Sequence, residues 1–161
     1  MENRFPIQQK INFLQVAEVK LSYITKVKPA DRPKITTSKD AQNILYDYWD
    51  LSTIEHTESF KILLLNRFNS VLGITTISNG GITGTVVDIR VIFQYALKAN
   101  SSSIILCHNH PSNNPQPSEQ DLSITRKISD AGKLLDISVL DHIILTMDKV
   151  LYTSLADDGR M

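Results

Sequence analysis

Short apolar runs alternate with amphipathic stretches along this chain of 161 residues. Apolar residues in continuous runs or at every second position predict strands over residues 16–24, 60–65, 71–77, 82–87, 104–107, 137–145 and 150–152. Apolar residues three and four positions apart predict helices over residues 39–49, 88–100 and 118–135. Strands that alternate with helices favour an α/β fold, and the short connections favour some antiparallel pairs. We therefore expect an open mixed sheet with helices on both faces.

Individual residues mark the ends and the buried faces of these helices. Ser38 is the expected N-cap of the first helix. The second helix is expected to bury Val91, Ile92, Tyr95 and Ala96. The third helix is expected to bury Ile124, Ile128, Ala131 and Leu135.

The chain is long enough for one full domain with a sizeable core and too short for two ordinary ones. We assign residues 38–161 to this domain and residues 1–37 to an N-terminal arm with one strand. Prolines at positions 29 and 33 predict an extended connector over residues 26–37. The arm packs either on the domain or on a second copy of the chain, and the sequence leaves both arrangements open.

Composition and charge exclude several classes of protein. With 42% hydrophobic residues and 17 basic against 17 acidic residues, the chain is an ordinary globular protein of zero net charge. This balance argues against nucleic-acid binding, which needs a basic surface. No apolar run approaches the roughly 18 residues of a membrane span, and the N-terminus lacks the apolar core of a signal peptide. The one cysteine fits a reducing compartment, so we expect a cytoplasmic protein.

The strongest candidate for chemistry lies at the end of the strand over residues 104–107. His108 and His110 stand two residues apart, so their side chains point to the same face of a strand. Pro111 ends the strand, and a loop of turn-forming residues leads to a helix that contains Asp121. Two imidazoles and one carboxylate, with no fourth protein ligand, are typical of a catalytic zinc site that keeps one position for water.

Each of these residues also has a structural interpretation. Ser118 and Asp121 have the spacing of a capping box, which requires no metal. Asp121, however, shares a helix face with the apolar Ile124, and a buried carboxylate needs a partner. His56 and His142 are expected to be structural core histidines, and Cys107 a small buried hydrophobic residue.

Water at such a zinc site needs a general base that is not itself a ligand. Glu58 precedes the apolar strand over residues 60–65, which is a candidate neighbour of the histidine strand. Composition alone favours the simpler interpretation, an exposed glutamate at the end of a strand. Spacing alone therefore does not choose the base.

The residues Glu58, His108, His110, Ser118 and Asp121 match the JAMM (MPN+) metalloprotease signature, Glu…His-x-His-x7-Ser-x2-Asp. The chain more closely resembles the RadC family of the JAB/MPN type. Three motifs carry this resemblance: His108-Asn109-His110-Pro111-Ser112, Pro117-Ser118-Glu119-Gln120-Asp121 and Leu140-Asp141-His142-Ile143-Ile144. The similarity extends from about residue 18 to residue 152.

The resemblance implies a three-layer α/β/α fold of the JAB/MPN and cytidine deaminase-like group. It implies that His108, His110 and Asp121 bind one Zn²⁺ per chain. Glu58 would take a proton from the water at the zinc and later deliver it to the leaving amine, and Ser118 would donate a hydrogen bond to the developing oxyanion. The implied reaction is hydrolysis of a peptide or isopeptide bond in an unknown peptide or protein substrate.

The chain departs from the family pattern in two places. Asn113 stands where relatives usually have glycine, and asparagine tolerates the positive φ of such a turn. Longer relatives carry an N-terminal helix-hairpin-helix region of the DNA-binding type, whereas about 37 residues without a glycine-rich hairpin precede the domain here. The family name comes from a proposed role in DNA repair, and no residue of this sequence indicates that role.

Other functions fit the sequence less well. The letters His-Asn-His at 108–110 are consecutive, whereas the nuclease motif of that name spreads its residues over a ββ-helix unit. A nucleobase deaminase requires further cysteines, and a serine hydrolase requires a Gly-x-Ser-x-Gly turn. The alternative that stays open is a non-catalytic scaffold or a DNA-repair accessory protein, because a fold does not determine a function.

Overall fold

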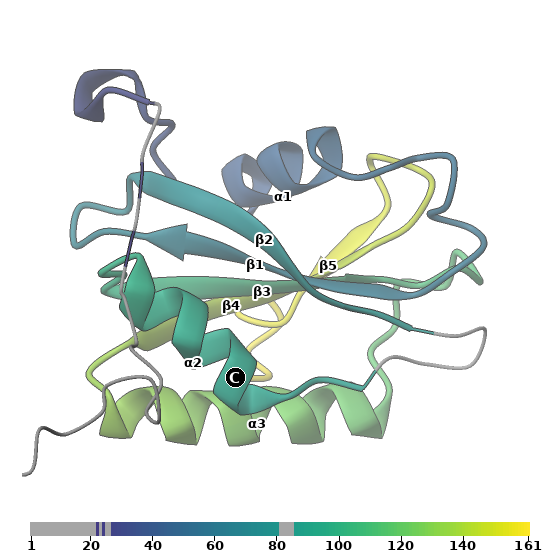
Figure 1. Ribbon diagram of the computed structural model, residues 1–161. Coiled ribbons are helices and arrows are strands. Elements are labelled where there is room, and N and C mark those ends of the chain that lie inside the picture. Colours follow the sequence, from purple (N-terminus) through teal and green to yellow (C-terminus); the bar gives the residue numbers. More distant parts are fainter. Residues whose placement is uncertain (1–21, 23, 25–26, 81–85) are drawn as a thin grey trace, which may run out of the picture.

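The computed structural model describes residues 22, 24, 27–80 and 86–161. One five-stranded mixed sheet has the order β2-β1-β3-β4-β5. Its strands are β1 (Ser59–Leu65), β2 (Val71–Asn79), β3 (Ser103–Asn109), β4 (Ser138–Leu145) and β5 (Tyr152–Ser154). Helix α1 (Ser38–Asp47) covers one face, and helices α2 (Ile89–Lys98) and α3 (Glu119–Leu134) cover the other (Figure 1). The expected three-layer α/β/α arrangement is confirmed.

The sheet separates two hydrophobic cores, because successive residues of a strand point to opposite faces. Alternate residues of β1 and β3 pack under α1 with Leu45 and Trp49. The residues between them pack under α2 and α3 with Ile92 and Ile128. Every residue of β1 and β3 is therefore buried, which explains why these strands are continuous apolar runs in the sequence.

The order of the strands brings distant parts of the sequence together. Strand β1 forms an antiparallel hairpin with β2 and pairs on its other side antiparallel to β3, with Phe60 opposite His108. Glu58, directly before β1, and His110, directly after β3, therefore lie at the same end of this strand pair and line one cleft. Strand β4 runs parallel to β3, with His142 beside Leu106. The end of β3 that carries the histidines is thus flanked by the start of β1 and by β4.

Several local predictions were wrong. Thr37, not Ser38, is the N-cap of α1, and it forms a capping box with Asp40. Tyr95 is 42% exposed, and Phe93 is buried in its place, because α2 packs against α3 as well as the sheet. Leu135 is also 42% exposed, because the helix ends at Leu134 and the apolar stripe stops there.

The arm and the edges of the sheet were predicted less well than the core. The connector is extended around Lys34, which bridges to Ser70, but it contains a short 3-10 helix, η2 (Pro29–Asp31). Strand β5 begins two residues later than the predicted strand over 150–152. The strands predicted over residues 16–24 and 82–87 lie almost wholly outside the described residues. The division of the chain at residue 37 stays a prediction.

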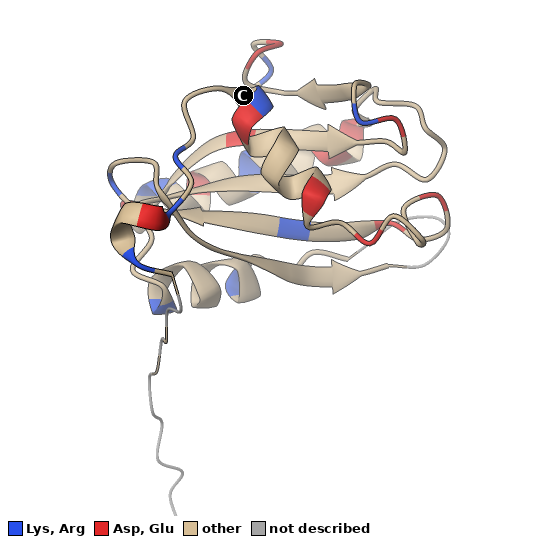
Figure 2. Ribbon diagram, turned by 90° about the horizontal axis from the view of Figure 1, so that it is seen from above, with Lys and Arg blue, Asp and Glu red and all other residues tan. Residues whose placement is uncertain are grey.

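The surface carries both signs of charge. Basic and acidic positions are interspersed along the described chain (Figure 2), and exposed ion pairs such as Lys149 with Asp47 join some of them. In the part of the chain that the structure describes, no helix combines the length and the apolar character needed to cross a membrane.

Candidate metal centre

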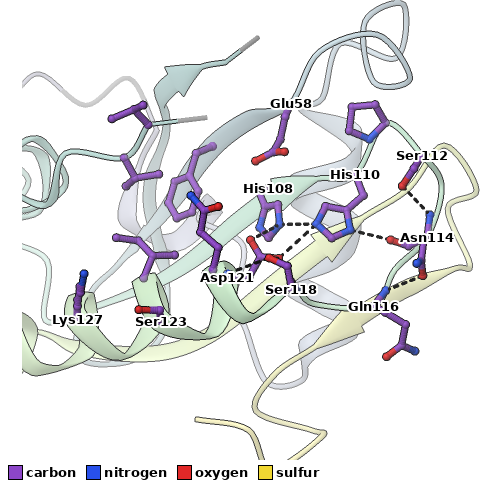
Figure 3. A pocket seen from close by; sticks show the side chains of 16 residues that line it. Glu58, His108, His110, Ser112, Asn114, Gln116, Ser118, Asp121, Ser123 and Lys127 are labelled. Atoms are coloured by element: carbon purple, nitrogen blue, oxygen red, sulfur yellow. Dashed lines mark hydrogen bonds and ion pairs between the residues drawn. The ribbon is translucent and has the colours of Figure 1, made fainter. Parts of the chain in front are cut away.

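The candidate site lies in a cleft of about 690 Å³ where the end of β3 meets the start of α3. Figure 3 shows Glu58, His108, His110, Ser118 and Asp121 gathered in this cleft, with Glu58 opposite Ser118 and Asp121. The first comes from the segment before β1, the histidines from the end of β3, and the last two from the start of α3. A fourth segment, Val86 and Val87 before α2, completes the lining of the cleft. Segments far apart in the sequence thus form one site.

Three donor groups converge at the centre of this cleft. His108 Nε2 lies 2.9 Å from His110 Nε2 and 3.2 Å from Asp121 Oδ1. His110 Nε2 lies 3.5 Å from Asp121 Oδ2. Tetrahedral coordination with bonds of 2.0–2.2 Å separates ligand atoms by about 3.3 Å. The spacing of the three donors therefore suits a zinc-sized ion.

Hydrogen bonds to the loop and to β4 determine which nitrogen of each ring faces the cleft. His110 Nδ1 donates to the carbonyl oxygen of Asn114 at 2.7 Å. His108 Nδ1 lies 2.8 Å from His142 Nε2. With hydrogens on Nδ1, both rings direct the lone pair of Nε2 toward the same point. Orienting partners of this kind are the usual outer shell of metal-bound histidines.

Asp121 has two roles that the sequence presented as alternatives. Ser118 and Asp121 do form a capping box, in which Asp121 Oδ2 accepts from the Ser118 N–H at 2.7 Å. The other oxygen, Oδ1, faces His108 Nε2. One carboxylate can thus cap α3 with one oxygen and present the other to the cleft.

The charges of these donors fit a bound cation. Burial raises the pKa of Asp121, but the two imidazoles of His108 and His110 that face its carboxylate outweigh this and hold the pKa well below its ordinary value. Burial lowers the pKa of His110, but its hydrogen bonds to Asp121 and Asn114 outweigh this and raise the pKa. Electron-rich atoms this close to one another need a cation between them, either a proton or a metal ion.

Glu58 is a carboxylate that lines the cleft and is not one of the three converging residues. It lies two residues before Phe60, whose ring stacks on His108 with a centroid distance of 6.2 Å. Alternation along the strand gives Glu58 and Phe60 the same face as the histidines. Glu58 is half-buried, and Figure 3 shows its carboxylate pointing toward the two imidazoles. The pairing of β1 with β3, which the sequence left open, thus brings Glu58 to the site.

The loop after the histidines keeps its turn despite the missing glycine. Asn113 has a φ of 58°, the conformation in which asparagine replaces glycine at least cost. Its side chain also accepts a hydrogen bond from the Met147 N–H at 2.8 Å and donates to Glu55. Asparagine therefore ties the loop to two neighbouring segments, which glycine cannot do.

Three further residues of the site were not recognised as such from the sequence. His142 was expected to be structural; it is fully buried, but it also bonds His108. Thr125 forms a hydrogen bond with His142 in turn, and its position one helical turn after Asp121 was the available signal.

His56 was wrongly expected in the core, since it is exposed. Cys107 is buried under α1 as expected, where burial raises the pKa of its thiol well above the ordinary value.

Asn109 is the third residue of the site that was not recognised from the sequence. It lies between the two histidines and points to the opposite face of the sheet. Its side chain accepts from the Ser59 N–H at 2.8 Å and donates to the carbonyl oxygens of Ile54 at 2.6 Å and Thr57 at 2.9 Å. Asn109 is fully buried, so water does not replace these bonds. It therefore fastens the segment that carries Glu58 to the histidine strand.

Replacing Asn109 with leucine is expected to lower the free energy of unfolding by about 3 kcal/mol, because three buried backbone groups lose their partner. Urea denaturation of wild type and variant measures this difference. Asn79→Leu is the matched control at the exposed end of β2, where the side chain accepts one hydrogen bond from the described residues, that of the Ser59 hydroxyl. Equal stability of Asn109→Leu and wild type would show that the three bonds do not hold the segment.

Comparison with known proteins agrees with this geometry. Residues 35–160 match the RadC-like JAB domain, so the fold is that of a JAB-domain protein. Within that class, the chain belongs to the RadC family. The family of JAB domains includes many metal-dependent hydrolases. In this chain, His108, His110 and Asp121 form a cluster that could hold a metal ion.

The relatives are bacterial proteins whose names give no activity. The chain is 44% identical over 126 residues to a UPF0758 protein of Flavobacterium johnsoniae. This alignment covers 78% of this chain and 53% of the relative. It is 39% identical over 131 residues to one of Desulfitobacterium hafniense, covering 81% and 56%. It is 36% identical over 153 residues to one of Clostridium botulinum, covering 95% and 64%. The chain thus spans between half and two thirds of the length of these relatives.

Proposed function

We propose that this protein is a zinc-dependent hydrolase of the JAMM type that cleaves peptide or isopeptide bonds. The observation that carries the proposal is the combination of three converging donors with a separate carboxylate, Glu58, in the same cleft. A structural metal site has no need of that separate carboxylate, and it is usually closed by a fourth protein ligand. Among the described residues, the cluster has three members and opens onto the cleft.

The donor set fits Zn²⁺ because imidazole nitrogen and carboxylate oxygen are both common zinc ligands. When bound, the ion supplies Lewis-acid chemistry: it lowers the pKa of a water molecule and polarises the carbonyl of the substrate. His108, His110 and Asp121 would hold the ion at the floor of the cleft. The remaining steps depend on the residues around it.

Glu58 acts in this proposal as general base and then as general acid. Its carboxylate accepts a proton from the attacking water and passes it to the leaving nitrogen, which must be protonated before the C–N bond breaks. A half-buried carboxylate suits this exchange, because it is accessible to substrate and yet partly shielded from solvent. Asn109 positions Glu58 through the backbone of residues 54–59.

Ser118 acts as a hydrogen-bond donor to the oxyanion that develops on the substrate carbonyl. In the structure, its hydroxyl donates to Asp121 Oδ2 at 2.6 Å. A hydroxyl has a single hydrogen, so Ser118 must release Asp121 to donate to substrate. The Ser118 N–H continues to hold Asp121 Oδ2, so the carboxylate keeps its orientation during this change.

Elemental analysis of protein purified without chelator tests the proposal. We expect about one zinc per chain in wild type and none in His110→Ala or Asp121→Ala, since a site of three protein ligands does not survive the loss of one. Asp130→Ala, on the exposed side of α3, is the matched control and should keep the metal. A wild type that neither contains zinc nor takes it up on titration would contradict the proposal and favour a scaffold function.

A further inference from the structure

His142 and Thr125 connect the two sides of the candidate metal centre behind the donors. His142 Nδ1 lies 2.6 Å from Thr125 Oγ1, and His142 Nε2 lies 2.8 Å from His108 Nδ1. Thr125 Oγ1 lies 2.6 Å from the main-chain oxygen of Asp121. Hydrogen bonds therefore run without a break from the backbone of one donor residue, Asp121, to the ring of another, His108.

Counting hydrogens determines the direction of every bond in this series. The carbonyl oxygen of Asp121 can only accept, so the one hydrogen of the Thr125 hydroxyl is donated to it. Thr125 Oγ1 must then accept from His142, which places the His142 hydrogen on Nδ1. His142 is fully buried, and burial disfavours a charged imidazole, so the ring is neutral and its Nε2 has no hydrogen.

The same count extends to His108. Because His142 Nε2 can only accept, the hydrogen of the third bond belongs to His108 Nδ1. A neutral His108 ring then has its lone pair on Nε2, the atom that faces His110 and Asp121. The opposite tautomer would place a hydrogen on Nε2 and exclude a metal ion from that atom.

Packing prevents these groups from finding other partners. His108 is 1% exposed, His142 is fully buried and Thr125 is 2% exposed, so water does not compete for the bonds. The ring of Phe60 stacks on His108 and meets His142 edge-on, with a centroid distance of 5.5 Å for the second pair. Both imidazoles are therefore held in one orientation before any ligand arrives.

We infer that Thr125 and His142 are positioning residues that fix the tautomer of His108, and thereby prepare its Nε2 to bind a metal ion. The inference rests on the proposed function for the identity of the ligand, but not for the tautomer. The series ends at the main-chain carbonyl oxygen of Asp121 in α3, which can only accept a hydrogen bond. The first turn of α3 thus supplies one donor directly, through Asp121, and orients a second from behind.

Nitrogen chemical shifts of the histidine rings in zinc-free wild type test the tautomer directly. Neutral histidine in water favours the hydrogen on Nε2, so a hydrogen on Nδ1 in both His108 and His142 is a distinctive result. We expect this pattern in long-range ¹H–¹⁵N NMR spectra. A hydrogen on Nε2 of His142 would overturn the inference, and no variant is needed to obtain that outcome.

Thr125→Val and Thr125→Ser test the consequence for metal binding. Valine has the shape of threonine without its hydroxyl, so His142 loses the acceptor that fixes its Nδ1 hydrogen. We expect zinc affinity, measured by competition with a chromophoric chelator, to fall by about 10-fold or more, because outer-shell partners of metal-bound histidine have effects of 10–100-fold. Serine keeps the hydroxyl and is expected to bind zinc within about threefold of wild type.

A merely structural role would lower the thermal midpoint of Thr125→Val without changing zinc affinity or the ring nitrogen shifts. A folded Thr125→Val protein with wild-type zinc affinity would therefore overturn the inference. Failure of the proposed function gives a different result, because wild type would then take up no zinc. The nitrogen shifts of His108 and His142 would still decide whether the series of hydrogen bonds fixes the tautomer.

Discussion

Replacing Glu58 with glutamine is expected to lower kcat/KM for peptide or isopeptide hydrolysis by about 1,000-fold while leaving the metal content unchanged. The amide has the size of the carboxylate but cannot accept a proton from water or deliver one to the leaving nitrogen. Glu58 is not among the three converging donors, so binding of the ion does not depend on it. Steady-state kinetics and elemental analysis of the same sample measure the two quantities.

Glu119→Gln is the matched control for this variant. Glu119 is exposed in the first turn of α3, close to the cleft in sequence but absent from its lining. Its replacement is expected to change kcat/KM by less than about twofold. Full activity of Glu58→Gln would remove Glu58 from the mechanism, and loss of zinc from that variant would instead make Glu58 a ligand.

Zinc is expected to raise the thermal midpoint of the metal-free protein by about 10 °C when present at about 1,000 times its dissociation constant. A ligand that binds only the folded state adds about 4 kcal/mol of stability at that ratio, and a domain of this length gains about 2–4 °C per kcal/mol. Differential scanning calorimetry of chelator-treated protein, before and after addition of zinc, measures the shift.

His110→Ala is the informative variant for this measurement. The His110 side chain is 16% exposed, so its removal disturbs the core less than removal of the buried His108, and we expect the zinc-dependent shift to disappear. Glu58→Gln is expected to keep the shift, because it leaves the three donors intact. A full shift in His110→Ala would place the zinc-binding site elsewhere in the protein.

Spacing, together with the family resemblance, indicated five candidate residues that the structure brings to the cleft. Their order along the chain and the spacing of His108, His110, Ser118 and Asp121 are local properties: the first two share a strand face, and the last two share one helical turn. The two apolar runs that became β1 and β3 were equally clear, because strands covered on both faces contain few polar residues.

The tertiary structure decided the relations that depend on contacts between distant segments. The pairing of β1 with β3 brings Glu58 to the histidines, and it also gives Asn109 its partners around residues 54–59. No sequence spacing reveals which strands are neighbours in a sheet, because pairing is set by the packing of the whole core. The choice of Glu58 over other carboxylates thus needed either the family resemblance or the fold.

The contrast is sharpest for His142. By its sequence, it is a polar residue in an apolar strand, and a core histidine was the natural interpretation. Whether such a ring is inert or orients a neighbour depends on which atoms lie within hydrogen-bond distance, and these come from β3 and α3. The sequence by itself therefore indicated the candidate ligand residues, while only the tertiary structure decided which of their atoms face one another, because direction is a property of contacts and not of spacing.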